Sequence, residues 1–288
     1  MKKKHHYVWK HYLKPWSKAG QIWAKHKERI FRTNLENVAQ RRFFYAVPRF
    51  GPVEQDFIRQ YIRNTSHPSA HQTLLDDLFI LQSIAIGTPE FRKTGLEDYH
   101  SMIESSMLEL MEMLYDEDLS FAQRETEKNL FAYFLGLQYV RTPARLYALE
   151  STLRIMSNHE TAPMEVQSMD MKAVAQGLSF IHANFVGNWL STATFSLLSA
   201  PKQEVLITGD QPVINVHADP ADLTIAPKKI ELYFPLTPNT GLWASEQQKD
   251  YLLTSAESRN LNEKIIKASL EQIYSESEES LLSATHFA

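Results

Sequence analysis

The spacing of apolar residues changes twice along this chain of 288 residues, and the two changes restrict the folds open to it. Between residues 51 and 200, apolar residues recur every three or four positions, as the buried face of a helix requires. Residues 1–50 and 201–288 instead contain short alternating or fully apolar runs that are typical of strands. We therefore expect an α+β fold with a largely helical middle, in which N-terminal and C-terminal strands form a small, mainly antiparallel sheet.

Local signals define the elements of the first two segments. Residues 21–25 and 29–32 alternate in polarity across a charged turn, which predicts a β-hairpin. Residues 43–47 fit either a further strand or a loop that fills the core. Prolines that suit the start of a helix stand at positions 52, 68 and 143.

The pattern of the C-terminal third begins with one long helix, expected over residues 171–198, and changes after Pro201. Strands are then expected at residues 204–208, 213–216 and 230–234. Ser255 is suited to cap a helix over residues 256–273. The residues from Tyr274 onward predict a last short strand and a frayed tail.

These elements predict a single α+β domain over residues 1–288. The domain would consist of a basic β-rich segment (1–50), a helical block (51–200) and a C-terminal part with strands, one helix and a tail (201–288). An apolar share of 43% is sufficient for a substantial core. The sequence contains no internal repeat and no flexible linker that would divide it.

Composition excludes several classes of protein. There is no run of about eighteen apolar residues, so no membrane span is expected. The basic start is not followed by an apolar segment and does not have the pattern of a secretory signal. The absence of cysteine excludes disulfides, thiolate chemistry and Cys-ligated metal sites. We therefore expect a cytoplasmic protein.

Charge is distributed very unevenly along the chain. Residues 1–49 carry thirteen Lys and Arg against two Asp and Glu, whereas the rest of the chain carries seventeen against thirty-two. The first 16 residues alone combine five lysines, three histidines and four aromatic residues. Such a segment can hold phosphates, stack on bases and transfer protons near neutral pH. The N-terminal part is therefore predicted to contact a polyanion.

Four short motifs follow one another along the chain. They are His-His-Tyr-Val at 5–8 with Tyr-Leu-Lys at 12–14, Leu-Gln-Tyr-Val-Arg-Thr-Pro at 137–143, Leu-Ile-Thr-Gly-Asp-Gln-Pro-Val at 206–213 and Phe-Pro-Leu-Thr-Pro at 234–238. In type and order they resemble the motifs of a widespread bacterial family catalogued as domain of unknown function 4238. Trp9 stands where that family has proline, and Gly209 where it has serine. The resemblance implies no mechanism, so the chemistry must be argued from the residues.

The first motif supplies two candidate catalytic histidines. His5 and His6 are adjacent, so in a strand they point to opposite faces and only one of them can face a cleft. The pKa of imidazole is about 6.5, which suits proton transfer near neutral pH. The alternative is structural: one histidine packs beneath the aromatic residues and the other is solvated.

The second and third motifs supply a cation and a carboxylate. Arg141 follows an apolar helix and can bind phosphate through its planar fork, or can neutralise helix-end carbonyls or an internal carboxylate. Arg145, one turn later, can share either task. Asp210 follows a predicted strand and can orient a histidine or hold a cation. Its turn sequence also suits an aspartate that bonds only nearby backbone amides.

No cofactor or metal site is predicted. His67 and His71 have the spacing of a helical metal pair, but Pro68 places His67 at the helix cap. The chain has no glycine-rich phosphate loop, nucleophile elbow or recognisable pair of carboxylates. The sequence does not exclude that the reaction requires a divalent cation such as Mg²⁺.

The leading hypothesis is a hydrolase that acts on RNA or single-stranded DNA, of the kind found in RNase-like toxins and defence effectors. One of His5 and His6 would transfer protons, oriented by Asp210, while Arg141 would stabilise charge at phosphorus. Substrate-binding side chains would be Tyr7, Lys10, Tyr12, Lys14 and Arg145, with Trp9 and Trp16 as further stacking rings.

Two alternatives belong to other classes. A non-catalytic module that binds nucleic acid or a partner protein explains the charge distribution without any titrating histidine. In the other alternative, the basic segment covers the acidic remainder of the same chain and contacts nothing else. The lysines between residues 2 and 18 would then be paired rather than exposed.

Overall fold

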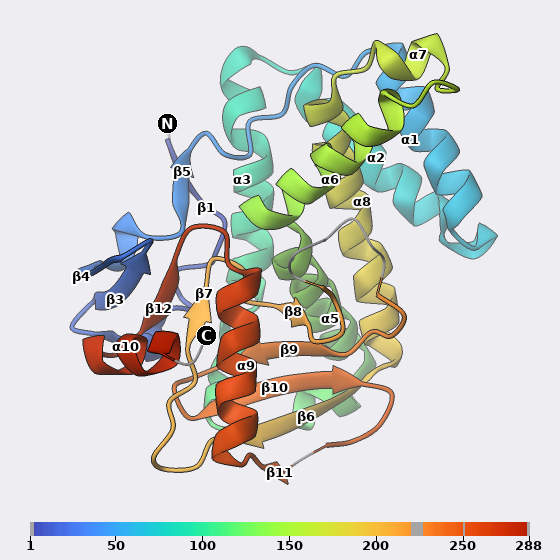
Figure 1. The fold of residues 1–288 in the computed structure, drawn as a ribbon. Coiled ribbons are helices and arrows are strands. Elements are labelled where there is room, and N and C mark those ends of the chain that lie inside the picture. Colours follow the sequence, from blue (N-terminus) through green and yellow to red (C-terminus); the bar gives the residue numbers. More distant parts are fainter. Residues whose placement is uncertain (1–2, 220–226, 250, 287–288) are drawn as a thin grey trace.

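The computed structural model describes residues 3–219, 227–249 and 251–286 (Figure 1). Helices fill the middle of the chain, and strands from both ends lie beside them. The predicted α+β class is therefore confirmed. No helix among the described residues is both long and apolar enough to cross a bilayer.

The helical block contains eight α-helices. They are α1 (Pro52–Thr65), α2 (His71–Ala85), α3 (Pro89–Ser106), α4 (Leu108–Tyr115), α5 (Glu125–Val140), α6 (Pro143–Ser157), α7 (Met164–Gln167) and α8 (Met171–Thr192). Short 3-10 helices occur at Lys14–Trp16, Leu35–Asn37, Pro68–Ala70 and Ser120–Gln123. Proline occupies the first turn of α1, α3 and α6, where its missing N–H leaves no helical bond unmade.

Helices α5 and α8 pack against each other at the centre of the block (Figure 1). Gly136 of α5 faces Gly187 of α8, and a Cβ atom on Gly136 would lie 2.5 Å from the carbonyl oxygen of Ala183. The two backbones can approach this closely because neither glycine has a side chain.

Strands from the two ends of the chain share one sheet, as predicted. It contains β2 (Ser17–Lys18), β3 (Gln21–His26), β4 (Arg29–Asn34), β7 (Thr208–Gly209) and β12 (Ile273–Ser275). The predicted hairpin is the antiparallel pair β3–β4. Strand β12 from the C-terminal part lies between β3 and β7 and is antiparallel to both. A separate antiparallel ribbon pairs β1 (Lys4–His6) with β5 (Gln40–Arg42).

A second sheet forms from the C-terminal third. Its order is β11 (Tyr251–Leu252), β6 (Thr194–Ser199), β10 (Thr240–Ser245), β9 (Leu232–Pro235) and β8 (Ile214–Asn215). Only the β6–β11 pair is parallel; the other pairs are antiparallel. All residues of β9 and β10 are buried.

Several predicted boundaries in the C-terminal third are wrong. The helix predicted over 171–198 ends at Thr192, because Ala193 is extended and the next six residues pair with β10. The strand predicted at 204–208 is reduced to β7. Helix α9 (Ser255–Ala268) is capped by Thr254 through a capping box with Glu257, not by Ser255. The expected frayed tail contains helix α10 (Glu278–His286).

All three segments of the chain contribute to the main core. Tyr12 comes from the N-terminal segment, Phe134 and Phe180 from the helical block, and Phe234 and Tyr274 from the C-terminal part. We retain the prediction of a single domain, because these side chains form one contiguous apolar cluster. The loop alternative for residues 43–47 is confirmed: these residues belong to no strand, and Tyr45 and Val47 fill the core.

Candidate nucleic-acid interface

His5, the first of the two candidate histidines, is fully buried on β1. Its Nδ1 accepts a hydrogen bond of 3.1 Å from the backbone N–H of Tyr45, whose ring stacks on the imidazole with 6.0 Å between centroids. The hydroxyl of Tyr45 donates to the carbonyl oxygen of Arg141 at 3.3 Å. Tyr45 therefore joins the first sequence motif to the second inside the core.

Arg141 pairs with an internal carboxylate, which was one of the structural roles that its sequence position allowed. Its side chain is buried, and Nη2 donates to Oε1 of Glu104 at 2.5 Å and to Oε1 of Gln138 at 3.1 Å. Burial by itself would lower the pKa of Arg141, but the Glu104 carboxylate reverses the direction and raises it. The guanidinium is thus a buried, charged partner of Glu104 and presents no open fork to a phosphate.

Asp210 is also buried, and it holds the C-terminal part of the chain. Its carboxylate accepts hydrogen bonds from three consecutive backbone N–H groups, those of Leu270 at 2.8 Å, Glu271 at 2.7 Å and Gln272 at 3.0 Å. Burial raises the pKa of Asp210 to about 6, and the three amides act in the opposite direction. The structural alternative for Asp210 was a bond to nearby backbone amides, but the amides that it bonds lie 60–62 residues away in the chain.

Aromatic residues in the first motif and next to it also make buried contacts with the other motifs. The hydroxyl groups of Tyr12 and Thr208 are 2.6 Å apart, and the ring of Tyr12 stacks on Phe234 with 4.6 Å between centroids. The indole N–H of Trp16 donates to the carbonyl oxygen of Leu206 at 3.0 Å. The hydroxyl of Thr142 donates to Oε1 of Gln211. The four sequence motifs therefore contact one another in the interior. We call these contacts between the motifs the buried seam.

The burial of these rings corrects the predicted substrate contacts. Tyr7 and Tyr12 are 2% and 1% exposed, and Trp16 is fully buried, so base stacking by these residues does not fit the structure. Trp9 packs on His11 and on Phe134. Tyr45 links His5 to Arg141, whereas the carboxylate of Asp210 is bonded to the amides of residues 270–272. All three side chains are buried, so the proposed catalytic trio does not line a common open cleft.

The lysines between the buried rings point to solvent instead. Lys3, Lys4, Lys10, Lys14 and Lys18 are all exposed. Of these, Lys10 approaches Glu36 at 3.8 Å and Lys4 donates to the amide oxygen of Asn37 at 3.5 Å, both at the surface. The alternative in which the basic segment is paired internally is therefore wrong for the described lysines; Lys2 lies outside the described residues.

One face of the β1–β5 ribbon concentrates this exposed charge. Lys4 lies directly opposite Arg42, and both side chains are exposed. His6 lies opposite Gln40 on the same face, because side chains two residues apart in a strand point the same way. Like charges directly opposite each other on a sheet repel, so this pair costs stability in the free protein.

Phe43 adds a ring to this face. The guanidinium carbon of Arg42 is 5.1 Å and Nζ of Lys93 is 5.7 Å from the centroid of the Phe43 ring. Phe43 has φ of 51°, a left-handed conformation that is rare for an aromatic residue and costs free energy. Two cations therefore lie within about 6 Å of the centroid of this half-exposed ring. We call Lys4, His6, Arg42, Phe43 and Lys93 the ribbon face.

Sequence reasoning located this surface only in part. It identified His6 and the excess of lysine, but not Arg42, Phe43 or Lys93. The run Arg41-Arg42-Phe43 was a usable signal, since it joins cations to an aromatic ring within three positions. Lys93 had no signal, because only the packing of α3 beside the ribbon brings it to Phe43.

The other predicted binding residues lie apart. Lys14 is exposed at the first 3-10 helix, and Lys10 is exposed beside Glu36. Arg145 does not join Arg141; its guanidinium instead lies over the ring of Tyr139, at 4.1 Å from the centroid. Among the described residues there is no group of three His, Asp or Glu side chains placed to hold a metal ion.

Comparison with known proteins identifies one family. The model of the family described as "Protein of unknown function (DUF4238)" matches residues 4–279. Comparisons with curated proteins and with solved structures find no match. The resemblance noted from the sequence is therefore confirmed over nearly the whole chain, and the function has to be argued from the ribbon face itself.

Proposed function

Because this chain belongs to the DUF4238 family, whose name assigns no activity, we propose from the structure that it binds single-stranded nucleic acid through the ribbon face. The observation that carries the proposal is the exposed pair Lys4 and Arg42, placed directly opposite each other. A bound phosphate would relieve the repulsion between the two cations, because it places a negative charge between them.

The ring of Phe43 favours a single strand over a duplex. Unpaired bases stack on aromatic rings and on guanidinium planes, and Phe43 and Arg42 present one of each side by side. The lysines at positions 3, 10, 14 and 18 extend the positive charge along the same segment. The proposal is thus the binding module that the sequence left as an alternative, with its contacts moved from the buried rings to the ribbon face.

Salt dependence provides the test. We expect a labelled single-stranded RNA or DNA to bind with an affinity that falls steeply between about 50 and 200 mM salt. The variant Lys4→Ser/Arg42→Ser should reduce the magnitude of the slope of log K against log salt by about 1.4, since each phosphate contact on a single strand contributes about 0.7. Fluorescence anisotropy measures both quantities.

The matched control is Lys172→Ser/Lys202→Ser, which removes two exposed lysines from other parts of the surface. It should leave the slope within error of the unmodified protein. Equal slopes for both double variants would remove the ribbon face from consideration. Binding of polyglutamate but of no nucleic acid would instead support the protein-binding form of the module.

A hydrolase is the second candidate, favoured by the position of His6. It is the one catalytic candidate that keeps partial exposure, and it shares a strand face with Lys4. In this form, which includes an RNase-like toxin or defence effector, His6 would transfer protons at a phosphate held by the cations. Incubation with total RNA and single-stranded DNA, with and without Mg²⁺, tests for turnover. If cleavage occurs and His6→Asn leaves its rate unchanged, this assignment is wrong.

A further inference from the structure

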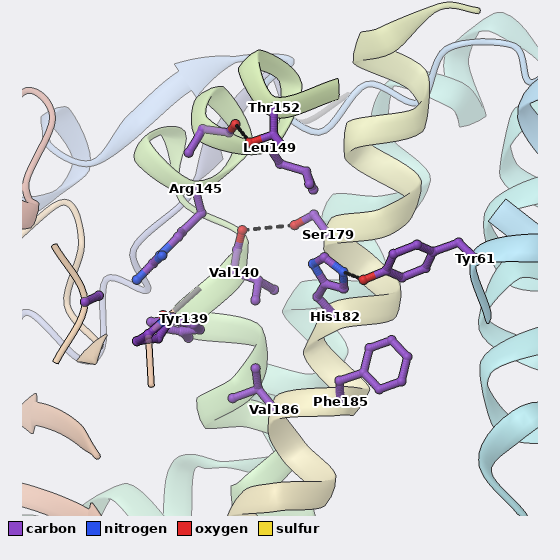
Figure 2. A pocket seen from close by; sticks show the side chains of 13 residues that line it. Tyr61, Tyr139, Val140, Arg145, Leu149, Thr152, Ser179, His182, Phe185 and Val186 are labelled. Carbon is purple, nitrogen blue, oxygen red and sulfur yellow. Dashed lines mark hydrogen bonds between the residues drawn. The ribbon is translucent and has the colours of Figure 1, made fainter. Parts of the chain in front are cut away.

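A cavity of about 410 Å³ is lined by residues of helices α1, α5, α6 and α8 together with Ala218 and Pro227 (Figure 2). None of the described residues that line it belongs to the ribbon face. Its volume is within the range of small-molecule sites in proteins. Leu149, Val140, Phe185 and Val186 make most of its wall apolar (Figure 2). The cavity is thus large enough for a small organic ligand and suited to an apolar body.

Arg145 is the one cation among the described residues that line this cavity. It extends from the first turns of α6, and its guanidinium stacks on Tyr139, 4.1 Å from the ring centroid (Figure 2). No ion pair or hydrogen bond to a carboxylate is formed by Arg145 within the described structure, and no Asp or Glu lines the cavity there. Burial lowers the pKa of this guanidinium, and a bound anion would offset that cost.

The opposite side of the cavity is polar but uncharged at neutral pH. Nε2 of His182 lies 2.7 Å from the hydroxyl of Tyr61, and the second ring nitrogen is on the side of the ring away from Tyr61 (Figure 2). Burial lowers the pKa of His182 to about 4 and raises that of Tyr61, so both are neutral at pH 7. With Tyr61 as donor to Nε2, the other nitrogen carries the proton and is a hydrogen-bond donor.

Two further hydroxyl groups can only accept from a ligand. Ser179 donates its proton to the carbonyl oxygen of Val140 at 2.9 Å, and Thr152 donates to that of Ala148 at 3.0 Å (Figure 2). Each oxygen keeps lone pairs that can accept a hydrogen bond from a ligand with a donor group. The cavity therefore combines one cation, one neutral imidazole, two acceptors and a mainly apolar wall.

We propose that this cavity binds a small organic monocarboxylate with an aromatic or short alkyl body. The guanidinium of Arg145 presents a planar fork that matches the two oxygens of a carboxylate. The apolar walls then cover the body of the ligand, and burial of that surface supplies affinity. A phosphate monoester fits less well, since a doubly charged group would have only one cation to pair with in the described lining.

The sequence motifs give this cavity a rigid wall. Gln211 of the third motif donates to the carbonyl oxygen of Tyr139 at 3.0 Å, and Thr142 of the second motif donates to Gln211. The buried seam thus fixes the end of α5 and the start of α6, the two elements that place Tyr139 and Arg145. A fixed arginine loses less conformational entropy on binding than a mobile one.

The test uses phenylacetate and octanoate as probes, with phenylacetamide and phenyl phosphate for comparison. We expect calorimetry to show that both carboxylates bind the full-length protein, and that the uncharged amide and the phosphate bind roughly tenfold or more weakly. Arg145→Gln should weaken carboxylate binding roughly tenfold or more. Leu149→Trp, which fills the cavity and keeps the guanidinium, should have the same effect.

Arg154→Gln is the matched control, because Arg154 lies on the same helix but at the surface, paired with Glu150. It should bind the carboxylates as the unmodified protein does. The proposal is overturned if the amide binds as tightly as the carboxylate, if phenyl phosphate binds more tightly, or if neither carboxylate binds at all. None of these variants should alter RNA binding by the ribbon face, so the two proposals can fail independently.

Discussion

Asp77 shows how strongly one buried carboxylate can depend on a single partner. It lies on α2 with 7% of its surface exposed, and its described hydrogen-bond partner is the side-chain amide of Asn184 on α8. Burial raises the pKa of Asp77 to about 7, and the bond from Asn184 offsets only part of this shift. The folded state therefore holds a proton on Asp77 at pH values where the unfolded chain has released it.

The pH dependence of stability follows from this difference. Between about pH 4 and pH 7 the folded state binds more protons at this site, so the free energy of unfolding falls as pH rises. The fall amounts to at most about 4 kcal/mol, since one unit of pKa shift corresponds to about 1.4 kcal/mol. Asp77→Asn should remove this contribution and be more stable than the unmodified protein at pH 7.5, as measured by urea unfolding. In the control Asp98→Asn, at an exposed position on α3, the free energy of unfolding should depend on pH as in the unmodified protein. The same pH dependence in Asp77→Asn would contradict the assignment.

The sequence was sufficient to identify which residues of the candidate site have chemically able side chains. It was not sufficient to predict which of these side chains are buried. His5 and Asp210 were identified from their motifs, yet each is buried and accepts hydrogen bonds from backbone groups at least forty positions away in the chain. Alternation along β1 shows that His5 and His6 face opposite ways, but it does not show which of them faces the core. That choice depends on Tyr45, which bonds both His5 and the carbonyl oxygen of Arg141 in the helical block.

At the scale of elements, the close approach of α5 and α8 gives a sharp prediction. Gly136→Ala would place a Cβ atom 2.5 Å from a backbone carbonyl oxygen, which has no freedom to move aside. We expect a loss of about 1–3 kcal/mol in the free energy of unfolding, as for other overpacked sites. Gly95→Ala is the control: its Cβ would meet only side-chain atoms, at 3.0 Å or more. Chemical denaturation that ranks the two variants equally would contradict this account of the packing.

Helices were easier to predict than strands in this chain, for a physical reason. Proline at the first turn identifies a helix start locally, and the starts of α1 and α6 agree with the prediction. Strand β6 was missed because its apolar residues continue those of α8 without any Gly or Pro between them. Its strand character comes from pairing with β10, more than forty residues later, and a local pattern does not contain that information.

At the scale of the whole molecule, the two ends of the chain are joined through Asp210. Strand β12 pairs with β3 from the N-terminal segment and with β7, which leads directly into Asp210. The same carboxylate holds the three amides that precede β12. The sequence predicted that strands from both ends would share a sheet, but the residue that secures the arrangement was interpreted as a catalytic candidate.

The two interpretations of Asp210 predict different results for Asp210→Asn. If the carboxylate is structural, an amide nitrogen replaces one acceptor oxygen, and at least one backbone N–H loses its partner in a buried site. We expect a loss of about 2–3 kcal/mol in the free energy of unfolding, because a bond to a charged group is lost and a buried donor is left without a partner. Hydrogen exchange should accelerate most at residues 270–275. Asp116→Asn, which changes an exposed carboxylate at the end of α4, should alter neither measurement. A variant with unchanged stability and exchange but with lost cleavage of RNA would restore the catalytic role, since a structural carboxylate cannot be removed without a cost to the fold.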